Sequence, residues 1–168
     1  SGVTSGMNSE GLTVTINAGK STIPLKAKTP ISLVVREILQ YAKTIDEAIE
    51  IAKSKEVFVS ESIMVSSAAD RKAVLIEISP KKFEVKYPTQ DYLISTNHFQ
   101  SSEYQNDKRN IKQMNESHSM YRYAKLEEQI AALKPFDDQK VAKVLRDYTG
   151  LNKKNIGFGN EKALNQLL

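Results

Sequence analysis

The chain has 168 residues, of which 40% are hydrophobic and 26% charged, enough for one globular domain with a real core. The absence of cysteine excludes disulfide bonds and thiolate metal sites, and two histidines give no credible metal cluster. The net charge of +4 comes from 24 basic and 20 acidic residues scattered along the chain, which favours a solvated surface over a nucleic-acid site.

The first third of the chain predicts a strand, a loop and two helices. Apolar and polar residues alternate over 12–17, which predicts a half-buried strand, and the polar stretch 19–29 predicts a loop. Pro30 is well placed at a helix start, before an apolar stripe at helical spacing: Ile31, Val34, Val35, Ile38 and Leu39. Thr44 and Glu47 form a capping box, which predicts a second helix.

The middle of the chain predicts a meander of strands followed by a long connection. Four strands are expected over 62–67, 73–78, 83–87 and 92–96, separated by polar turns and by a proline. The segment 100–118 is polar, nearly free of aliphatic residues and long for a connection. We therefore predict that it is a mobile loop or lid.

The last third of the chain predicts three helices. Ser119 is expected to cap a helix that ends near Leu133, and Asp137 to cap the next one. A final helix is expected to start at Asn160 and still to run at Leu168. Because that helix would have no C-cap, we expect the chain to be incomplete at this end.

The segment 93–99, LISTNHF, carries the strongest functional signal. The predicted strand before it would deliver Asn97 and His98 at its C-terminal tip, where side chains can be held rigidly at a cleft. About twenty residues later, SMYRYAKLEE puts Arg122 in the first turn of an amphipathic helix. An amide that can donate to an oxyanion, with a fixed cation nearby, suits acyl-transfer chemistry.

Each of these residues also has a structural interpretation. Asn97 is a common turn former, and His98 could simply hydrogen-bond its neighbours instead of acting as an acid or base. Arg122 could simply form an ion pair with Glu116 or Glu127, without a role in a site. The residues taken one by one leave both interpretations open.

Four pieces in one order carry a family resemblance: GMNSEGLTVTINA, AKTIDEAIEIAKS, IMVSSAADRKAVLIEISPKKFEV, and LISTNHF followed by SMYRYAKL. On them, the chain resembles the acyl-coenzyme A:6-aminopenicillanic acid acyltransferase family, relatives of choloylglycine hydrolase and penicillin V acylase among the N-terminal-nucleophile hydrolases. The resemblance covers about 6–133 and extends more weakly to the end.

The resemblance implies an α+β fold, a four-layer αββα sandwich of two antiparallel sheets, here truncated, with 1–168 as a single incomplete domain. It also implies an N-terminal cysteine that attacks an amide or thioester carbonyl while its own α-amine serves as base. In this pattern Asn97 matches the oxyanion-side asparagine, and Asn17 matches a second donor position that varies among relatives. Arg122 matches the arginine that helps to organise the nucleophile and its charged neighbours.

The implied nucleophile is not in this chain, because the chain has no cysteine. We therefore expect an amide-bond (C–N) hydrolase or acyltransferase whose cysteine lies upstream of Ser1, so that this chain alone is inactive. A cloned or proteolytic fragment is the favoured explanation, ahead of one chain of a self-processed pair. Ser1 could itself be a nucleophile, but we favour its being a truncation point or a cloning scar. The alternative to an enzyme is a non-catalytic binding or scaffold protein that keeps the fold.

The expected partner is a small amide or thioester of the acyl-amine or acyl-CoA type, and the implied reaction needs no cofactor or metal. We expect neither a nucleic-acid nor a membrane partner, and a homo-oligomer stays open. No apolar stretch approaches the roughly 20 residues needed to cross a bilayer. The compartment is undetermined between the cytoplasm and export after signal removal.

Overall fold

The computed structural model describes residues 1–22 and 28–165. Part of the predicted loop 19–29, and the end of the predicted last helix, therefore lie outside the described residues. Contacts group the chain into two compact units, Ser1–Gln113 and Met114–Leu168, and each unit is described by itself. A single incomplete domain over 1–168 stays a prediction.

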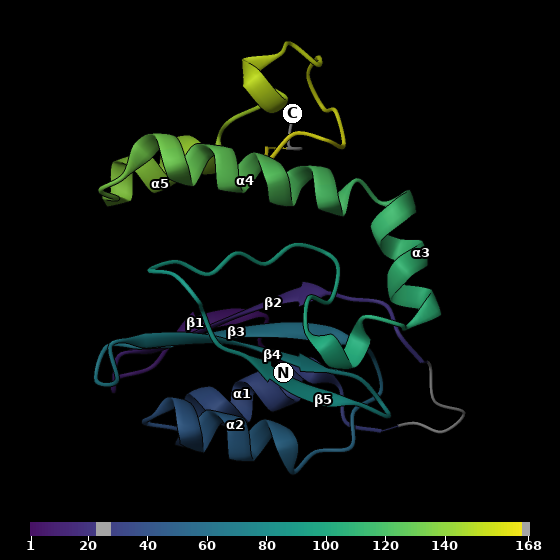
Figure 1. Ribbon diagram of the computed structural model, residues 1–168. Helices are drawn as coiled ribbons and strands as arrows, with labels where there is room; N and C mark the ends of the chain where they lie inside the picture. Colours follow the sequence, from purple (N-terminus) through teal and green to yellow (C-terminus); the bar gives the residue numbers. More distant parts are fainter. Residues whose placement is uncertain (23–27, 166–168) are drawn as a thin grey trace. The chain divides into compact units, whose positions relative to one another are not determined.

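The first unit is built on an antiparallel sheet of five strands in the order β1-β2-β3-β4-β5 (Figure 1). The strands are β1 (Ser5–Met7), β2 (Leu12–Ala18), β3 (Glu61–Ser67), β4 (Lys72–Ile78) and β5 (Phe83–Lys86). The predicted strands over 12–17, 62–67, 73–78 and 83–87 are confirmed. β1 was not predicted, because three residues centred on Gly6 carry no alternation.

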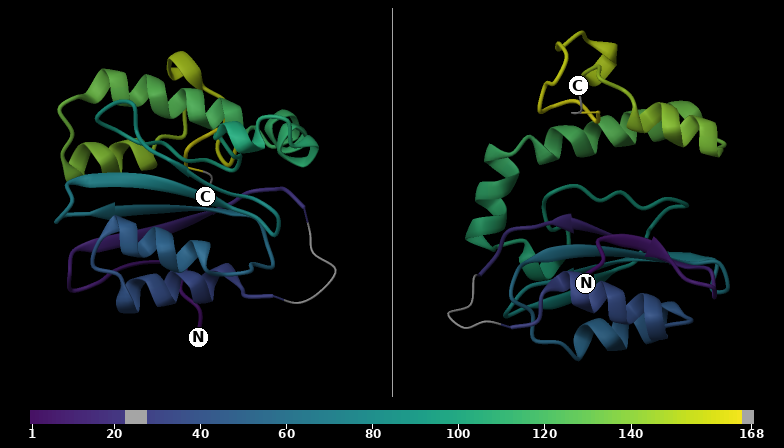
Figure 2. Two further views of the ribbon diagram at one scale, coloured as in Figure 1. Left: turned by 60° about the horizontal axis from the view of Figure 1, so that its bottom comes forward. Right: turned by 180° about the vertical axis from the view of Figure 1, so that it is seen from behind.

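Two helices cover one face of this sheet (Figures 1 and 2): α1 (Ile31–Tyr41) and α2 (Ile45–Lys53). Pro30 is the N-cap residue of α1, as its position predicted. The Thr44 side chain accepts a hydrogen bond from the Glu47 N–H, as the capping box requires. The Glu47 carboxylate, however, accepts from the N–H of Lys43, one residue before the cap, at 2.7 Å.

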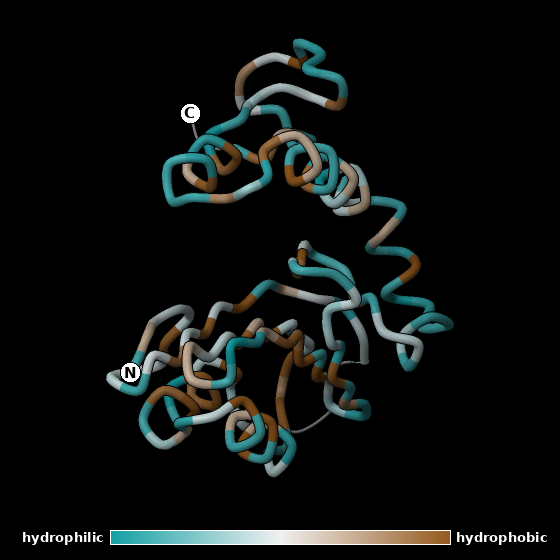
Figure 3. Tube along the Cα trace, turned by 60° about the vertical axis from the view of Figure 1, so that its left-hand side comes forward, coloured by the Kyte–Doolittle hydropathy of each residue, from teal (hydrophilic) through white to brown (hydrophobic). Residues whose placement is uncertain are grey.

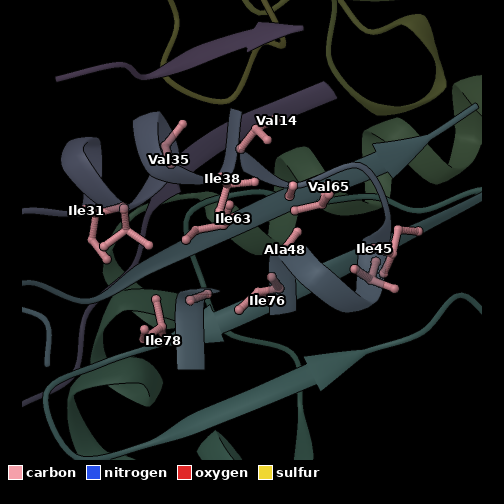
Figure 4. Close-up of a cluster of buried hydrophobic side chains, with 14 of the residues drawn as sticks. Val14, Ile31, Val35, Ile38, Ile45, Ala48, Ile63, Val65, Ile76 and Ile78 are labelled. Atoms are coloured by element: carbon pink, nitrogen blue, oxygen red, sulfur yellow. The ribbon is translucent and has the colours of Figure 1, made fainter. Parts of the chain in front are cut away.

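The core of the first unit lies between these helices and the sheet (Figure 4). Alternate strand residues point into it, and they are fully or almost fully buried: Leu12, Val14, Ile63, Val65, Val74, Ile76 and Ile78. Figure 3 shows hydrophobic residues (brown) interspersed with hydrophilic residues (teal) along the chain. In the first unit, α1 and α2 thus form a helical layer on one sheet, and the described residues of the chain do not include a second sheet of the αββα sandwich.

The prediction of a strand over 92–96 is wrong. These residues are extended but belong to no ladder among the described residues, and the segment 88–101 crosses the face of the sheet opposite α1 and α2 (Figure 1). Pro88 has no N–H to offer a ladder. Side chains satisfy part of this backbone instead: Gln100 Nε2 donates to the Ile94 carbonyl at 2.8 Å.

The segment 100–118 was predicted to be a mobile loop or lid; its mobility stays a prediction, but the segment contains regular structure. It contains a short 3₁₀ helix (Ser102–Tyr104) and α3 (Lys108–Glu116). The Asp107 carboxylate accepts hydrogen bonds from the N–H groups of Arg109 and Asn110 at the start of α3. Hydrogen bonds between polar side chains and the backbone stabilise this segment. A pattern of apolar residues in the sequence cannot predict such bonds.

The second unit contains α4 (Ser119–Leu133), α5 (Asp138–Leu145) and a short 3₁₀ turn (Leu151–Lys153). Asp137 caps α5 by accepting from the Lys140 N–H, as predicted. Ser119 does not cap α4: it is the buried first residue of the helix, and His118 before it has a φ of 54°.

The predicted helix at Asn160 is wrong for the residues that are described. Residues 160–165 form turns and bends. The Asn160 side chain donates to the Ile156 carbonyl and accepts from the Lys162 N–H, so it competes with helical hydrogen bonding. Within residues 1–22 and 28–165, every helix is too short or too polar to cross a membrane.

Candidate functional site

Two of the three predicted site residues meet at the C-terminal end of β2. Asn17 Nδ2 donates to Ser95 Oγ at 3.0 Å, and Asn97 Nδ2 donates to the carbonyl of Ala18 at 3.2 Å. The end of β2 and the segment 95–97 therefore exchange hydrogen bonds in both directions. Both carboxamides are half-buried, so each is held in place and still reaches the surface.

The register of the sheet explains why Asn17 faces this segment. Leu12, Val14 and Ile16 point to the helix-covered core, so Asn17 lies on the opposite face. It pairs with Ser62 on β3, which pairs with Glu77 on β4. Paired residues point to the same side of a sheet, so these polar residues form one row beneath the segment 88–101.

His98 lies beside the site but is 96% buried, with a relative exposure of 4%. Its Nδ1 is 3.1 Å from the hydroxyl of Thr96, two residues earlier. This contact and its burial favour the structural interpretation over a role as acid or base.

Arg122 belongs to the second unit, in the first turn of α4. Its Nη1 donates to the carbonyls of Ser117 at 3.1 Å and Glu161 at 2.8 Å, which ties the guanidinium to the residues just before α4 and to residue 161. Burial lowers the pKa of the guanidinium, while the Glu161 carboxylate acts in the opposite direction. The group is therefore a positioned cation, held by two backbone carbonyls.

A cavity of about 600 Å³ lies in the first unit, at the other end of the same strands. It is lined by Thr13 and Ser66 on the sheet, Arg71 at the β3–β4 turn, and Tyr92 and Leu93 in the crossing segment. Thr13 and Asn17 are four residue steps apart along β2, roughly 13 Å. None of the predicted site residues lines this cavity. In the described part of the chain, no cluster of three or more acidic or histidine side chains is placed to hold a metal ion.

Sequence reasoning did not single out the groups that fasten the segment after Asn97. The Glu77 carboxylate, with no exposed surface, binds Gln100 and Ser101. Asn110 binds both backbone polar groups of Phe99. A lone acid in the apolar strand AVLIEI is a usable signal for Glu77. An asparagine in a polar helix gives none.

Comparison with known proteins shows the family. The sequence profile of the acyl-coenzyme A:6-aminopenicillanic acid acyl-transferase family matches residues 1–156. The chain belongs to this family. The resemblance noted on four motifs is thereby confirmed. Among curated proteins, sequence comparison finds no match.

A solved structure supports the fold. The chain is similar to a Caenorhabditis elegans ortholog of N-acylethanolamine-hydrolyzing acid amidase, with a TM-score of 0.65 and 22% sequence identity. The match covers 88% of this chain and 64% of that chain, so this member of the family spans less than two thirds of the amidase. The predicted α+β, N-terminal-nucleophile hydrolase fold is confirmed.

Proposed function

We propose that this chain is the part of an amide-bond hydrolase or acyltransferase that holds the oxyanion donors for a cysteine nucleophile. The cysteine would come from a segment upstream of Ser1 in the complete protein. Family membership supports the reaction class. The observation that carries the proposal is the convergence of the Asn17 and Asn97 carboxamides on the end of β2.

In this mechanism the thiolate attacks the carbonyl carbon of an amide or thioester, and the carbonyl electron pair moves to oxygen. Asn97 donates an N–H to that oxygen, with Asn17 as a second donor. Donors that are already fixed need no reorganisation, and removing one from an oxyanion site typically costs about 3 kcal/mol. Collapse expels the amine or thiol, which takes the proton that the α-amine of the cysteine removed from its thiol. Water or an amine then attacks the acyl-enzyme, the α-amine takes its proton, and the cysteine thiolate leaves.

We assign Arg122 to the stabilisation of the nucleophile and its charged neighbours. Its guanidinium is held by two carbonyl groups, so it supplies a fixed positive charge. A fixed cation favours the thiolate over the thiol. Replacement by lysine would keep the charge but lose the planar, fixed donor geometry of the guanidinium.

The substrate class is a small acyl amide or acyl thioester. The matched family acts on acyl-coenzyme A and 6-aminopenicillanic acid, and the structural relative hydrolyses N-acylethanolamines, as their names state. A panel with an acyl-CoA, an acyl-6-aminopenicillanic acid and an N-acylethanolamine, each at equal concentration, therefore samples the substrate chemistries that these names give.

The test uses the complete protein expressed from the full gene. Mass spectrometry of the mature protein should find an N-terminal cysteine, and iodoacetamide should label it and abolish turnover. Asn97→Ala should lower kcat by about 100-fold with little change in KM. Asn106→Ala, at an exposed asparagine of the same unit, is the matched control and should keep full activity.

Two results would reject the proposal. One is a mature protein with no cysteine at its N-terminus and no turnover of any substrate in the panel. The other is an Asn97→Ala variant as active as the parent. The first result would favour the binding or scaffold alternative, in which the fold is kept without the reaction.

A further inference from the structure

The Glu77 carboxylate is the unusual charge of the first unit, because it is completely buried in an apolar strand. It accepts hydrogen bonds from the Gln100 N–H at 2.6 Å, the Ser101 N–H at 2.9 Å and the Ser101 hydroxyl at 2.5 Å. No lysine or arginine of the described residues forms an ion pair with it. The donors that stabilise its charge therefore come from the segment just after Asn97.

The same segment is closed on itself by the side chain of Gln100. Its Nε2 donates to the Ile94 carbonyl at 2.8 Å, and its Oε1 accepts from Lys86 Nζ at 2.7 Å. Residues 94–100 thus form a loop whose two ends are tied together, with Asn97 at its middle. Glu77 binds the C-terminal end of that loop, at residues 100 and 101.

Phe99 ties the loop to the end of β2. Its N–H donates to Asn110 Oδ1 at 2.8 Å, and its carbonyl accepts from Asn110 Nδ2 at 3.0 Å. Its ring packs so closely on Gly19 that a Cβ there would lie 2.6 Å from the ring. Gly19 follows Ala18, the residue whose carbonyl binds the Asn97 amide. A shift of the loop would therefore move Asn97 relative to β2.

We propose that Glu77 is a positioning residue that sets the orientation of the Asn97 carboxamide. The proposal rests on the proposed function. Charge-assisted hydrogen bonds to a buried carboxylate are strong, and a buried charge that loses its donors is costly. The loop is therefore held in one position. Asn17 and Glu77 both pair with Ser62, on either side of it in the sheet. The positions of both proposed donors are therefore fixed relative to the same three strands, β2, β3 and β4.

Glu77→Gln separates positioning from folding. The hydrophobic core lies on the opposite face of the sheet, so the variant keeps the packing that folds the unit. One oxygen becomes an NH₂ group that faces the N–H or O–H donors of residues 100 and 101, so the loop must shift. Displacing a reacting group by about 1 Å can cost 100-fold in rate.

The experiment measures kcat and KM of the complete protein for Glu77→Gln, Asn97→Ala and the double variant. We expect Glu77→Gln to lower kcat by tenfold to about 100-fold with KM changed less than threefold. In the Asn97→Ala background the same substitution should lower kcat by less than about twofold, because the positioned group is gone. Glu77→Asp keeps the charge and should recover part of the rate. Glu84→Gln, at the residue paired with Glu77 on β5, is the matched control and should keep full activity.

Equal losses of kcat from Glu77→Gln in both backgrounds would overturn the proposal, as would full activity of Glu77→Gln. An Asn97→Ala variant with full activity would instead reject the proposed function. If Glu77→Gln fails to fold, Ser101→Ala replaces it. This change removes one of the three donors, and it should lower kcat in the parent but not in the Asn97→Ala background.

Discussion

Replacing Lys125 by methionine should destabilise the second unit by about 2–4 kcal/mol. The lysine side chain has no exposed surface, although it comes from the middle of α4. Its Nζ donates to the Gly150 carbonyl at 2.7 Å and lies 3.1 Å from Glu128 Oε1 and 3.4 Å from Asp147 Oδ2. Methionine keeps most of the apolar length of lysine but offers no donor and no charge.

The magnitude follows from what each partner keeps. The buried Gly150 carbonyl loses its 2.7 Å donor, and an unsatisfied buried polar group costs about 1–3 kcal/mol. Asp147 keeps the N–H and the hydroxyl of Thr149, both at 2.7 Å, and Glu128 is 31% exposed to water. Each carboxylate therefore loses about 1 kcal/mol or less.

The assay is denaturant unfolding of the complete protein, together with hydrogen exchange of the amides in α4 and in residues 146–154. Exchange should become faster there for Lys125→Met, by the factor that corresponds to the lost free energy. Lys143→Met makes the same substitution at an exposed position of α5 and should change stability by less than about 0.5 kcal/mol. A Lys125→Met variant as stable as this control would refute the reasoning.

Two further predictions concern single polar groups. In the described residues the buried Ser62 hydroxyl has no hydrogen-bond partner. Ser62→Ala should therefore leave the free energy of unfolding within about 0.5 kcal/mol of the parent value or raise it. A loss above about 1 kcal/mol in denaturant unfolding would contradict this. Burial raises the pKa of Asp147, but hydrogen bonds from Thr149 outweigh it, so the pKa lies below the usual 3.8. Because the pKa of Asp147 is lower in the folded protein than in the unfolded chain, its carboxylate stabilises the fold at pH values above the unfolded-state pKa, and this stabilisation is lost as the pH falls below about 4. Acid unfolding followed by circular dichroism should therefore depend less on pH in Asp147→Asn.

Local sequence patterns predicted the helices and strands whose stability comes from a single apolar face. The alternation over 12–17 and the stripe before Leu39 repeat with the period of their elements, and both faces are buried in the same core. The caps at Thr44 and Asp137 were equally predictable, because the bonded N–H groups lie three residues away. These features need no knowledge of distant segments.

The segment 88–118 could not be predicted in this way, because its partners are far away in sequence. An apolar run over 92–96 looks like a strand, but strand pairing needs a free sheet edge, and this run crosses a sheet face instead. Tyr104 is fully buried, and its hydroxyl is satisfied there by donating to the backbone carbonyl of Lys82 at 2.8 Å. A polar sequence therefore conceals a packed segment.

The candidate site shows both what local sequence patterns can predict and what they cannot. Asn97 was proposed from a motif, and Asn17 from its place in the same family pattern, yet neither motif says what keeps the two amides together. That role falls to two contacts between residues that lie 78 and 79 positions apart in the sequence, Asn17 with Ser95 and Asn97 with Ala18. A charged residue in an otherwise apolar strand is a local sequence signal for these contacts. A buried carboxylate without an ion-pair partner is tolerated only where other groups donate hydrogen bonds to it. Glu77 is such a residue, and the donors it requires lie in the loop that carries Asn97.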